Sequence, residues 1–187
     1  MTEQSIISAT QKWLTTFVIA YNICPFAQRE QQRGSIRYRL ANAADLPTVL
    51  QTLIDECEYL DANPETETTL LIAPSGYADF DDYLDLLAIA EQLLIDQGYE
   101  GVYQLASFHP DYCFADSTDS NQLDPANYTN RAPYPMLHII REASLERVLA
   151  HYPDPENIPE RNIKLTHELG QEKLQALLAA CYHSPSD

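Results

Sequence analysis

Basic residues are missing from the whole middle of this chain: none occurs between Ala41 and Asn130. Lys and Arg number 11 against 28 Asp and Glu, which gives a formal net charge of -17. Nucleic acids and anionic membranes are bound by clustered cations, and the chain offers only a small cluster from Arg29 to Arg39. We therefore expect no nucleic-acid partner and no membrane partner. The acidity is typical of a highly soluble protein.

Long apolar runs and a secretion signal are also absent. No run approaches the roughly 20 apolar residues that a membrane span needs, and the first residues lack the basic and apolar segments of a signal peptide. The 4 cysteines are far apart and form no C-x-x-C pair, which is typical of reduced thiols. These features predict a cytoplasmic protein.

Common catalytic signatures are missing as well. The chain has no GxGxxG, P-loop, GxSxG or HExxH motif, which removes the commonest nucleotide-binding, α/β-hydrolase and zinc-protease readings. His109 and Cys113 lie near Asp111 and Asp116, but zinc ligands usually occur as pairs at closer, repeated spacings. We predict no metal site, and the cofactor stays unknown.

Apolar periodicity predicts the secondary structure. Helical spacing predicts helices over residues 4–23, 46–60, 80–95, 144–151 and 159–181. Apolar or alternating runs predict strands over residues 36–40, 68–73, 102–108 and 136–140.

The order of these elements predicts an α/β fold. We expect a single α/β domain over residues 1–183, with about four strands in a mostly parallel or mixed sheet flanked by helices. The first three strands should run parallel, whereas the fourth can run either way. An α+β ferredoxin-like sandwich is the alternative, and it needs a hairpin after the first crossover. Residues 184–187 are expected to form a frayed tail.

A long polar connection separates the third and fourth strands, and it is the best candidate for a site. Long loops inside compact domains are usually functional or disordered. Ligands of open α/β sheets bind outside the carboxyl ends of the strands, which places His109 at the favoured edge. An imidazole titrates near neutral pH and suits a general acid or base.

Arg131 and Arg141 are the basic residues that flank this connection, and a guanidinium suits a carboxylate or phosphate. We therefore expect a small anionic ligand, to which Asn130 could add an amide. His138 shares the strand phase of the apolar residues around it and is expected to be a buried, hydrogen-bonded side chain. Glu142, in the same phase, could orient it.

Cys24 precedes Pro25 at the end of the first predicted helix, where the helix dipole does not lower the pKa of a thiol. It also extends the apolar stripe of Trp13 and Phe17. A buried structural thiol is one interpretation, and a nucleophile is the other.

Several motifs in order along the chain resemble the bacterial family called domain of unknown function 1415. These motifs are Trp13, Cys24-Pro-Phe-Ala27, Ser107-Phe-His-Pro110, Asn127-Tyr-Thr-Asn-Arg131, Pro133-Tyr-Pro135, Arg141-Glu-Ala-Ser144 and Glu160-Arg-Asn-Ile163. The resemblance implies no activity. It adds Tyr112 and Arg161 to the candidate ligand-binding residues, and Cys113 does not belong to its pattern.

Three functions remain open. The first is a hydrolase or transferase that uses His109 as acid or base, with Arg131 and Arg141 holding the anion and Glu142 orienting a partner. The second is a non-catalytic binding or regulatory module with the same site. The third is a thiol-dependent protein centred on Cys24. The sequence does not decide whether the protein is an enzyme.

Overall fold

The computed structural model describes residues 2–41, 45–114 and 121–182. The chain divides into two compact units, each assembled from segments that are distant in the sequence. The sheet unit comprises Gln28–Phe108 and Tyr134–His151, and the helical unit comprises Met1–Ala27, His109–Pro133 and Tyr152–Asp187. The single domain over residues 1–183 stays a prediction, and the tail 184–187 lies outside the described residues.

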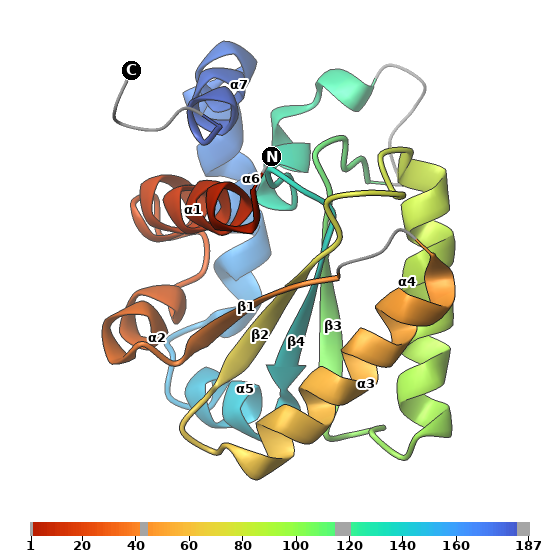
Figure 1. The fold of residues 1–187 in the computed structure, drawn as a ribbon. Helices are drawn as coiled ribbons and strands as arrows, with labels where there is room; N and C mark the ends of the chain where they lie inside the picture. The colour runs from red at the N-terminus through yellow and green to blue at the C-terminus, as the bar shows by residue number, and fades with distance from the viewer. Residues whose placement is uncertain (1, 42–44, 115–120, 183–187) are drawn as a thin grey trace. The chain divides into compact units, whose positions relative to one another are not determined.

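Four strands form one mixed sheet in the order β1-β2-β4-β3 (Figure 1). The strands are β1 (Ile36–Leu40), β2 (Thr68–Ile72), β3 (Tyr103–Phe108) and β4 (Met136–Arg141). β1 pairs with β2 in parallel, and β4 pairs antiparallel with both of its neighbours. The first three strands therefore run in one direction, as predicted, and the fourth runs against them. The α/β prediction is confirmed, and this order differs from a ferredoxin-like sandwich.

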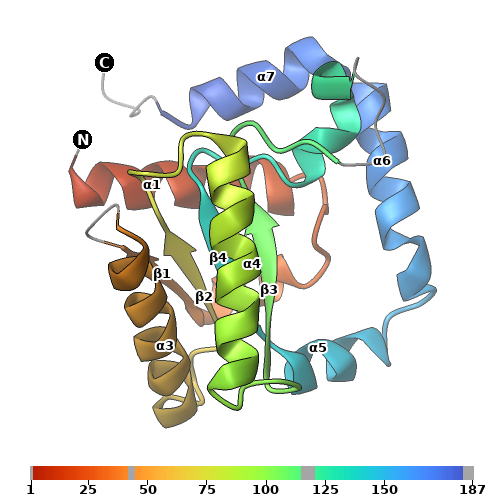
Figure 2. The same cartoon turned by 90° about the vertical axis from the view of Figure 1, so that its right-hand side faces the viewer.

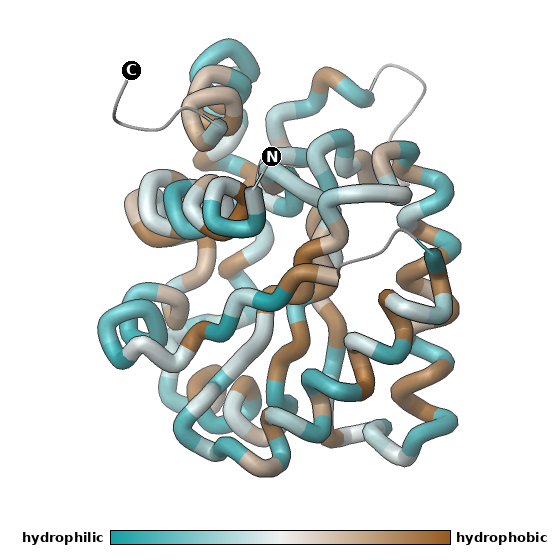
Figure 3. Tube along the Cα trace, viewed as in Figure 1, coloured by the Kyte–Doolittle hydropathy of each residue, from teal (hydrophilic) through white to brown (hydrophobic). Residues whose placement is uncertain are grey.

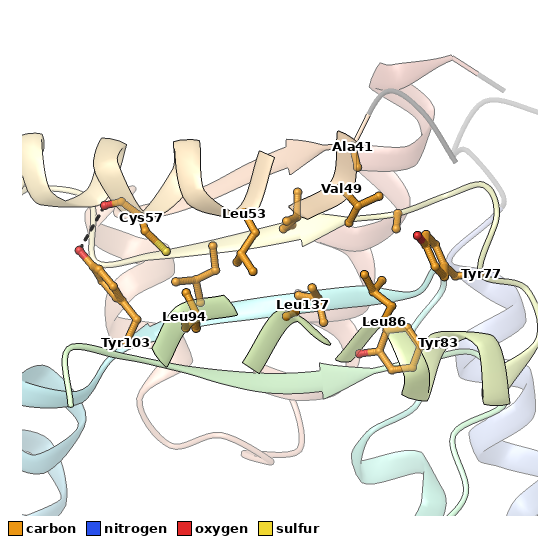
Figure 4. Packing of buried hydrophobic residues seen from close by; sticks show 14 of the residues in the cluster. Ala41, Val49, Leu53, Cys57, Tyr77, Tyr83, Leu86, Leu94, Tyr103 and Leu137 are labelled. Carbon is orange, nitrogen blue, oxygen red and sulfur yellow. Dashed lines mark hydrogen bonds between the residues drawn. The ribbon is translucent and has the colours of Figure 1, made fainter. Parts of the chain in front are cut away.

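Two long helices, α3 (Leu46–Ala62) and α4 (Phe80–Asp96), cover one face of the sheet (Figure 2). Both begin at an aspartate whose side chain accepts a backbone N–H of the first turn: Asp45 caps α3 and Asp79 caps α4. Figure 3 shows apolar residues recurring between polar ones along α4. The apolar stripes meet the sheet in a core (Figure 4) that includes Val49, Leu53, Leu60, Leu71, Leu86, Ala90, Leu94, Leu137 and Ile139.

Tyr83 joins the ends of β3 and β4. Its side chain is completely buried, and its hydroxyl donates to the carbonyl of Met136 at 2.7 Å. The same oxygen accepts the backbone N–H of Phe108 at 3.0 Å. Since Phe108 and Met136 face each other in register, the hydroxyl ties the two strands together at the last pair before the long connection.

Replacing Tyr83 with Phe should destabilise the sheet unit by about 1–3 kcal/mol, because buried backbone groups lose their hydroxyl partner. Urea unfolding of the purified protein measures this change. Tyr99→Phe is the matched control, since the Tyr99 hydroxyl reaches Asp61 at 3.3 Å near the surface. Equal stability of the two variants would contradict a structural role for the Tyr83 hydroxyl.

The basic cluster of the sequence is paired with carboxylates. Arg29 and Arg33 lie 3.7 and 3.5 Å from Glu30. On β1, Arg37 donates to the buried Glu56 of α3 at 2.7 Å, and Arg39 lies 3.6 Å from the same carboxylate. These ion pairs leave less positive charge for phosphates than the sequence alone suggests.

The helical unit begins with α1 (Glu3–Trp13), which continues as a π-helix over Leu14–Ile19. Its later helices are α6 (Ile158–Leu169) and α7 (Gln171–Ala180), and short 3-10 helices cover Asn121–Leu123, Pro125–Thr129 and Pro155–Asn157. The sheet unit adds α5 (Glu142–Leu149), and α2 (Ala27–Arg33) follows the first helical segment. Within the described residues, no helix is long and apolar enough to cross a membrane.

Two helix predictions need correction. The helix predicted over residues 4–23 changes to π-helical hydrogen bonding at Leu14 and ends before Asn22, which has a φ of 54°. The helix predicted over 159–181 is two helices, because Gly170 between them has a φ of 76°. Only glycine adopts such a φ without steric cost.

Candidate functional site

His109 begins the connection between β3 and β4 and is completely buried. Its Nδ1 accepts the backbone N–H of Asp111 at 3.0 Å, so the neutral ring carries its proton on Nε2. The His109 backbone N–H donates to the carbonyl of Asn130 at 3.2 Å. The imidazole is therefore part of a turn that closes the connection, and solvent does not reach it.

Arg131 holds the same connection together. Its guanidinium donates to the carbonyls of Tyr112 at 3.1 Å and Gln122 at 2.8 Å, and it lies 4.8 Å from the centre of the Tyr128 ring. Its own carbonyl accepts the indole N–H of Trp13 at 3.0 Å. The structure thus brings Arg131 and Tyr112 together, but it uses the guanidinium on backbone oxygens.

Arg141 has an equivalent structural role at the other end of β4. Its guanidinium donates to the carbonyls of Leu60 and Thr66 and to the hydroxyl of Tyr103. The bond to Leu60 holds the last turn of α3, and the bond to Thr66 holds the loop that leads into β2. Glu142 starts α5, and its backbone N–H donates to Val102 at 3.0 Å. This arrangement offers no support for anion binding by Arg141 or for an orienting contact from Glu142 to His138.

Cys24 follows a tight turn that ends the first helical segment. Asn22 adopts the left-handed conformation, with a φ of 54°, and the N–H groups of Asn22 and Ile23 donate to the carbonyls of Ile19 and Val18. This pattern is a Schellman motif, in which asparagine replaces the usual glycine. The turn redirects the chain, so that Cys24 lies just before α2 rather than at the end of a long helix.

Arg161 and Asn162 of α6 bind this turn from the side. The Arg161 guanidinium donates to the carbonyl of Asn22 and to the hydroxyl of Tyr152 at 3.2 Å. The Asn162 amide donates to the carbonyl of Ile23 at 2.8 Å. The polar motif that the sequence places at the start of the last helix therefore positions the segment before Cys24.

The Cys24 sulfur has a mixed environment. Burial raises the pKa of its thiol above the usual value, whereas the backbone N–H groups of Phe26 and Ala27 and the charge of Arg161 lower it. The residue is only partly buried, unlike Cys57, which is fully buried and whose pKa is raised to about 12, chiefly by burial. All four cysteines are free thiols. Cys24 is thus a protonated thiol beside groups that favour its thiolate.

His138 is hydrogen-bonded, as its strand phase predicts, and it is partly buried. Its Nε2 lies 2.6 Å from the hydroxyl of Thr68, which donates to the carbonyl of Ile139 at 2.5 Å. The hydroxyl has one hydrogen, so the imidazole must donate from Nε2, and Nδ1 carries the lone pair. Burial lowers the pKa of His138 to about 4, which keeps the ring neutral at pH 7. The Thr68–His138 contact joins two strands diagonally, so sequence spacing did not reveal it.

The low pKa of His138 should make stability pH-dependent. Between its unfolded pKa near 6.5 and its folded pKa of about 4, only the unfolded chain binds the proton. The free energy of unfolding should fall over this range by at most about 3 kcal/mol as the pH decreases. Urea unfolding at pH 7 and pH 4.5 tests this, because His138→Leu lacks the titration and keeps every carboxylate. A constant difference between wild type and variant at both pH values would contradict the shift.

The part of the chain that the structure describes contains no cluster of metal-binding side chains. No group of three or more His, Cys, Asp or Glu side chains there could hold a metal ion. Cys113 lies 3.9 Å from the amide nitrogen of Asn127, and Asp116 lies outside the described residues.

A family model described as "Protein of unknown function (DUF1415)" matches residues 5–176. The chain belongs to this family. No curated protein matches it, and no solved structure matches it. Family membership confirms the resemblance seen in the sequence motifs and assigns no activity, so the DUF1415 chain must be interpreted from its own side chains.

Proposed function

We propose that this DUF1415 protein carries out thiol-dependent chemistry at Cys24 on a small anionic molecule. The observation that carries the proposal is the placement of Arg161 and of two backbone N–H groups, those of Phe26 and Ala27, around the sulfur of a residue that is only partly buried. A thiolate is the reactive form of cysteine, and cations and N–H donors stabilise it.

The alternative centred on His109 has less support. An acid or base must reach the proton that it transfers, and His109 is completely buried. The two arginines expected to hold an anion, Arg131 and Arg141, each donate to backbone carbonyls. Among the residues proposed for chemistry, Cys24 is only partly buried and has a cation beside it.

Arg161 is suited to a double role in this proposal. It donates to Asn22 and Tyr152, which fixes the guanidinium, and its charge also acts on the Cys24 sulfur. A fixed cation needs no reorganisation when negative charge develops on sulfur or on a bound carboxylate. The chemistry requires a reduced thiol, in keeping with the cytoplasmic location that we infer.

Cys24 should react with iodoacetamide in the native protein. The thiolate attacks the methylene carbon, the C–S bond forms, iodide leaves, and the thiol proton passes to solvent. Because the resting thiol is protonated, the rate should rise about tenfold per pH unit below the pKa. Peptide mass spectrometry compares Cys24 with the buried Cys57 in the same sample. If Cys24 is alkylated only after denaturation, the proposal is wrong.

Arg161→Gln should slow the alkylation of Cys24 several-fold at pH 8, because the lost charge no longer lowers the thiol pKa. Anionic iodoacetate should lose more rate than neutral iodoacetamide, since the cation also attracts the reagent. Peptide mass spectrometry of both reactions gives the two rates.

Three controls separate charge from folding. Cys113 in the same sample should keep its rate, and Arg161→Lys, which retains a charge, should recover part of the Cys24 rate. Arg147→Gln is the matched variant, because the Arg147 guanidinium contacts Ser144 of its own helix at 3.2 Å. An equal iodoacetate-to-iodoacetamide ratio in wild type and Arg161→Gln would refute anion preference.

A further inference from the structure

β1 is an outermost strand of the sheet, and its outer edge is unpaired (Figure 1). The backbone of Ala41, just after the strand, donates to Ile72 of β2. Alternate residues of a strand direct their N–H and C=O groups to opposite edges. The backbone groups of Ile36, Tyr38 and Leu40 therefore point away from β2. No hydrogen bond to them occurs in the described part of the chain.

This outer edge is accessible to solvent. All five residues of β2 are buried, whereas four of the five residues of β1 are only partly buried. The side chains of Arg37 and Arg39 are 32% and 43% exposed. A strand edge that is both exposed and unpaired is a template on which another strand can pair.

Arg37 and Arg39 share a single carboxylate. Arg37 donates through Nε and Nη2 to both oxygens of Glu56, at 2.7 and 3.2 Å. The Nε of Arg39 lies 3.6 Å from Glu56 and makes no hydrogen bond. Glu56 therefore neutralises one of the two arginines. The charge of Arg39 remains beside the edge and can attract a carboxylate.

The two faces of β1 differ in chemistry. Arg37 and Arg39 extend toward α3, and the residues that alternate with them lie on the other face. There the Tyr38 hydroxyl reaches Gln31 of α2 at 3.4 Å, and Ile36 is partly exposed. A strand added at this edge would place carboxylates beside the arginines and apolar side chains beside Tyr38.

A second copy of this chain is a poor occupant of the edge. Two-fold symmetric pairing centred on Tyr38 would set Arg37 directly opposite Arg39 of the other copy. Like charges that face each other across two strands are destabilising. Each copy also carries a net charge of -17, which adds repulsion between the two molecules.

We propose that β1 binds an extended peptide segment of another protein, in which apolar and acidic residues alternate. The segment runs antiparallel to β1, the slightly more stable direction of pairing. Its apolar residues lie opposite Ile36, Tyr38 and Leu40 and bond to their backbone groups, and a carboxylate lies beside Arg39. Main-chain bonds supply affinity, and alternate side chains supply specificity. This site is independent of the thiol chemistry proposed at Cys24.

The peptide acetyl-Val-Glu-Val-Glu-Val-amide is the probe, in NMR titrations of the ¹⁵N-labelled protein at physiological ionic strength. It should shift the β1 amide resonances saturably. The matched peptide acetyl-Val-Lys-Val-Lys-Val-amide should bind about tenfold more weakly, because repulsion replaces attraction beside Arg37 and Arg39. No saturable shift with the glutamate peptide, or equal affinity of both peptides, would overturn the proposal.

Backbone N-methylation of the glutamate peptide separates strand pairing from charge attraction. In antiparallel pairing, the N–H groups of the three valines face β1, and those of the two glutamates face solvent. Methyl groups on the valine nitrogens should weaken binding at least tenfold, since they remove several hydrogen bonds. Methyl groups on the glutamate nitrogens should preserve most of the affinity. The reverse order would refute antiparallel pairing, and equal affinity of both methylated peptides would refute strand addition.

Amide hydrogen exchange locates the bound peptide. The N–H groups of Ile36, Tyr38 and Leu40 should exchange more slowly when the glutamate peptide is bound, whereas that of Arg37, which faces β2, should change little. Protection of the same three amides that rises with protein concentration in the absence of peptide would indicate self-pairing. That result would overturn the choice of an acidic partner.

Arg39→Gln should weaken binding of the glutamate peptide about twofold to fivefold, the range of an exposed ion pair. Affinity for acetyl-Val-Gln-Val-Gln-Val-amide should not change. Arg147→Gln is the matched control, since Arg147 contacts Ser144 of its own helix. Unchanged affinity for the glutamate peptide in Arg39→Gln, or an equal loss in Arg147→Gln, would refute the role of Arg39. Alkylation of Cys24 should be the same in Arg39→Gln and wild type.

Discussion

The architecture depends on β4, because this strand is hydrogen-bonded along both edges. It lies between two strands that run in the same direction, and it runs against both. The chain therefore has to return to the carboxyl end of β3 before β4 can begin, and residues 109–135 make this return. The turn at His109, with its bond to Asn130, and the Tyr83 hydroxyl that joins Phe108 to Met136 both serve this reversal.

At the positions where the sequence predicted arginines that bind an anion, the arginines bind mainly to backbone oxygens. Arg131, Arg141 and Arg161 each donate to carbonyls of turns or helix ends. A planar fork with five N–H donors can serve two carbonyls at once, which lysine cannot do in the same geometry. Anion binding and loop bracing need the same residue type, and only the contacts distinguish them. Arg161 is the one of the three with a reactive group beside it.

Local signals predicted most of the fold, and non-local contacts explain what they missed. The four strands were predicted from apolar runs, and the capping aspartates Asp45 and Asp79 mark two helix starts. Gly170 could have predicted the break in the last helix, whereas nothing local indicates π-helical bonding after Trp13. His109 was predicted as a catalytic residue from its position at the sheet edge. That position does not show that its side chain is buried. The partners of Cys24 and His138 lie far along the chain, at Arg161 and Thr68.

The bracing arginines also affect how charged molecules reach the protein. Their positive charge is committed to internal carbonyls, while the net charge of the chain is -17. An anion that approaches from bulk water therefore first meets repulsion, which extends about 8 Å at physiological ionic strength. Added salt shortens this range and leaves the close contact with Arg161 less affected. Anionic reagents should consequently encounter Cys24 faster as ionic strength rises, the reverse of what a basic binding protein would show.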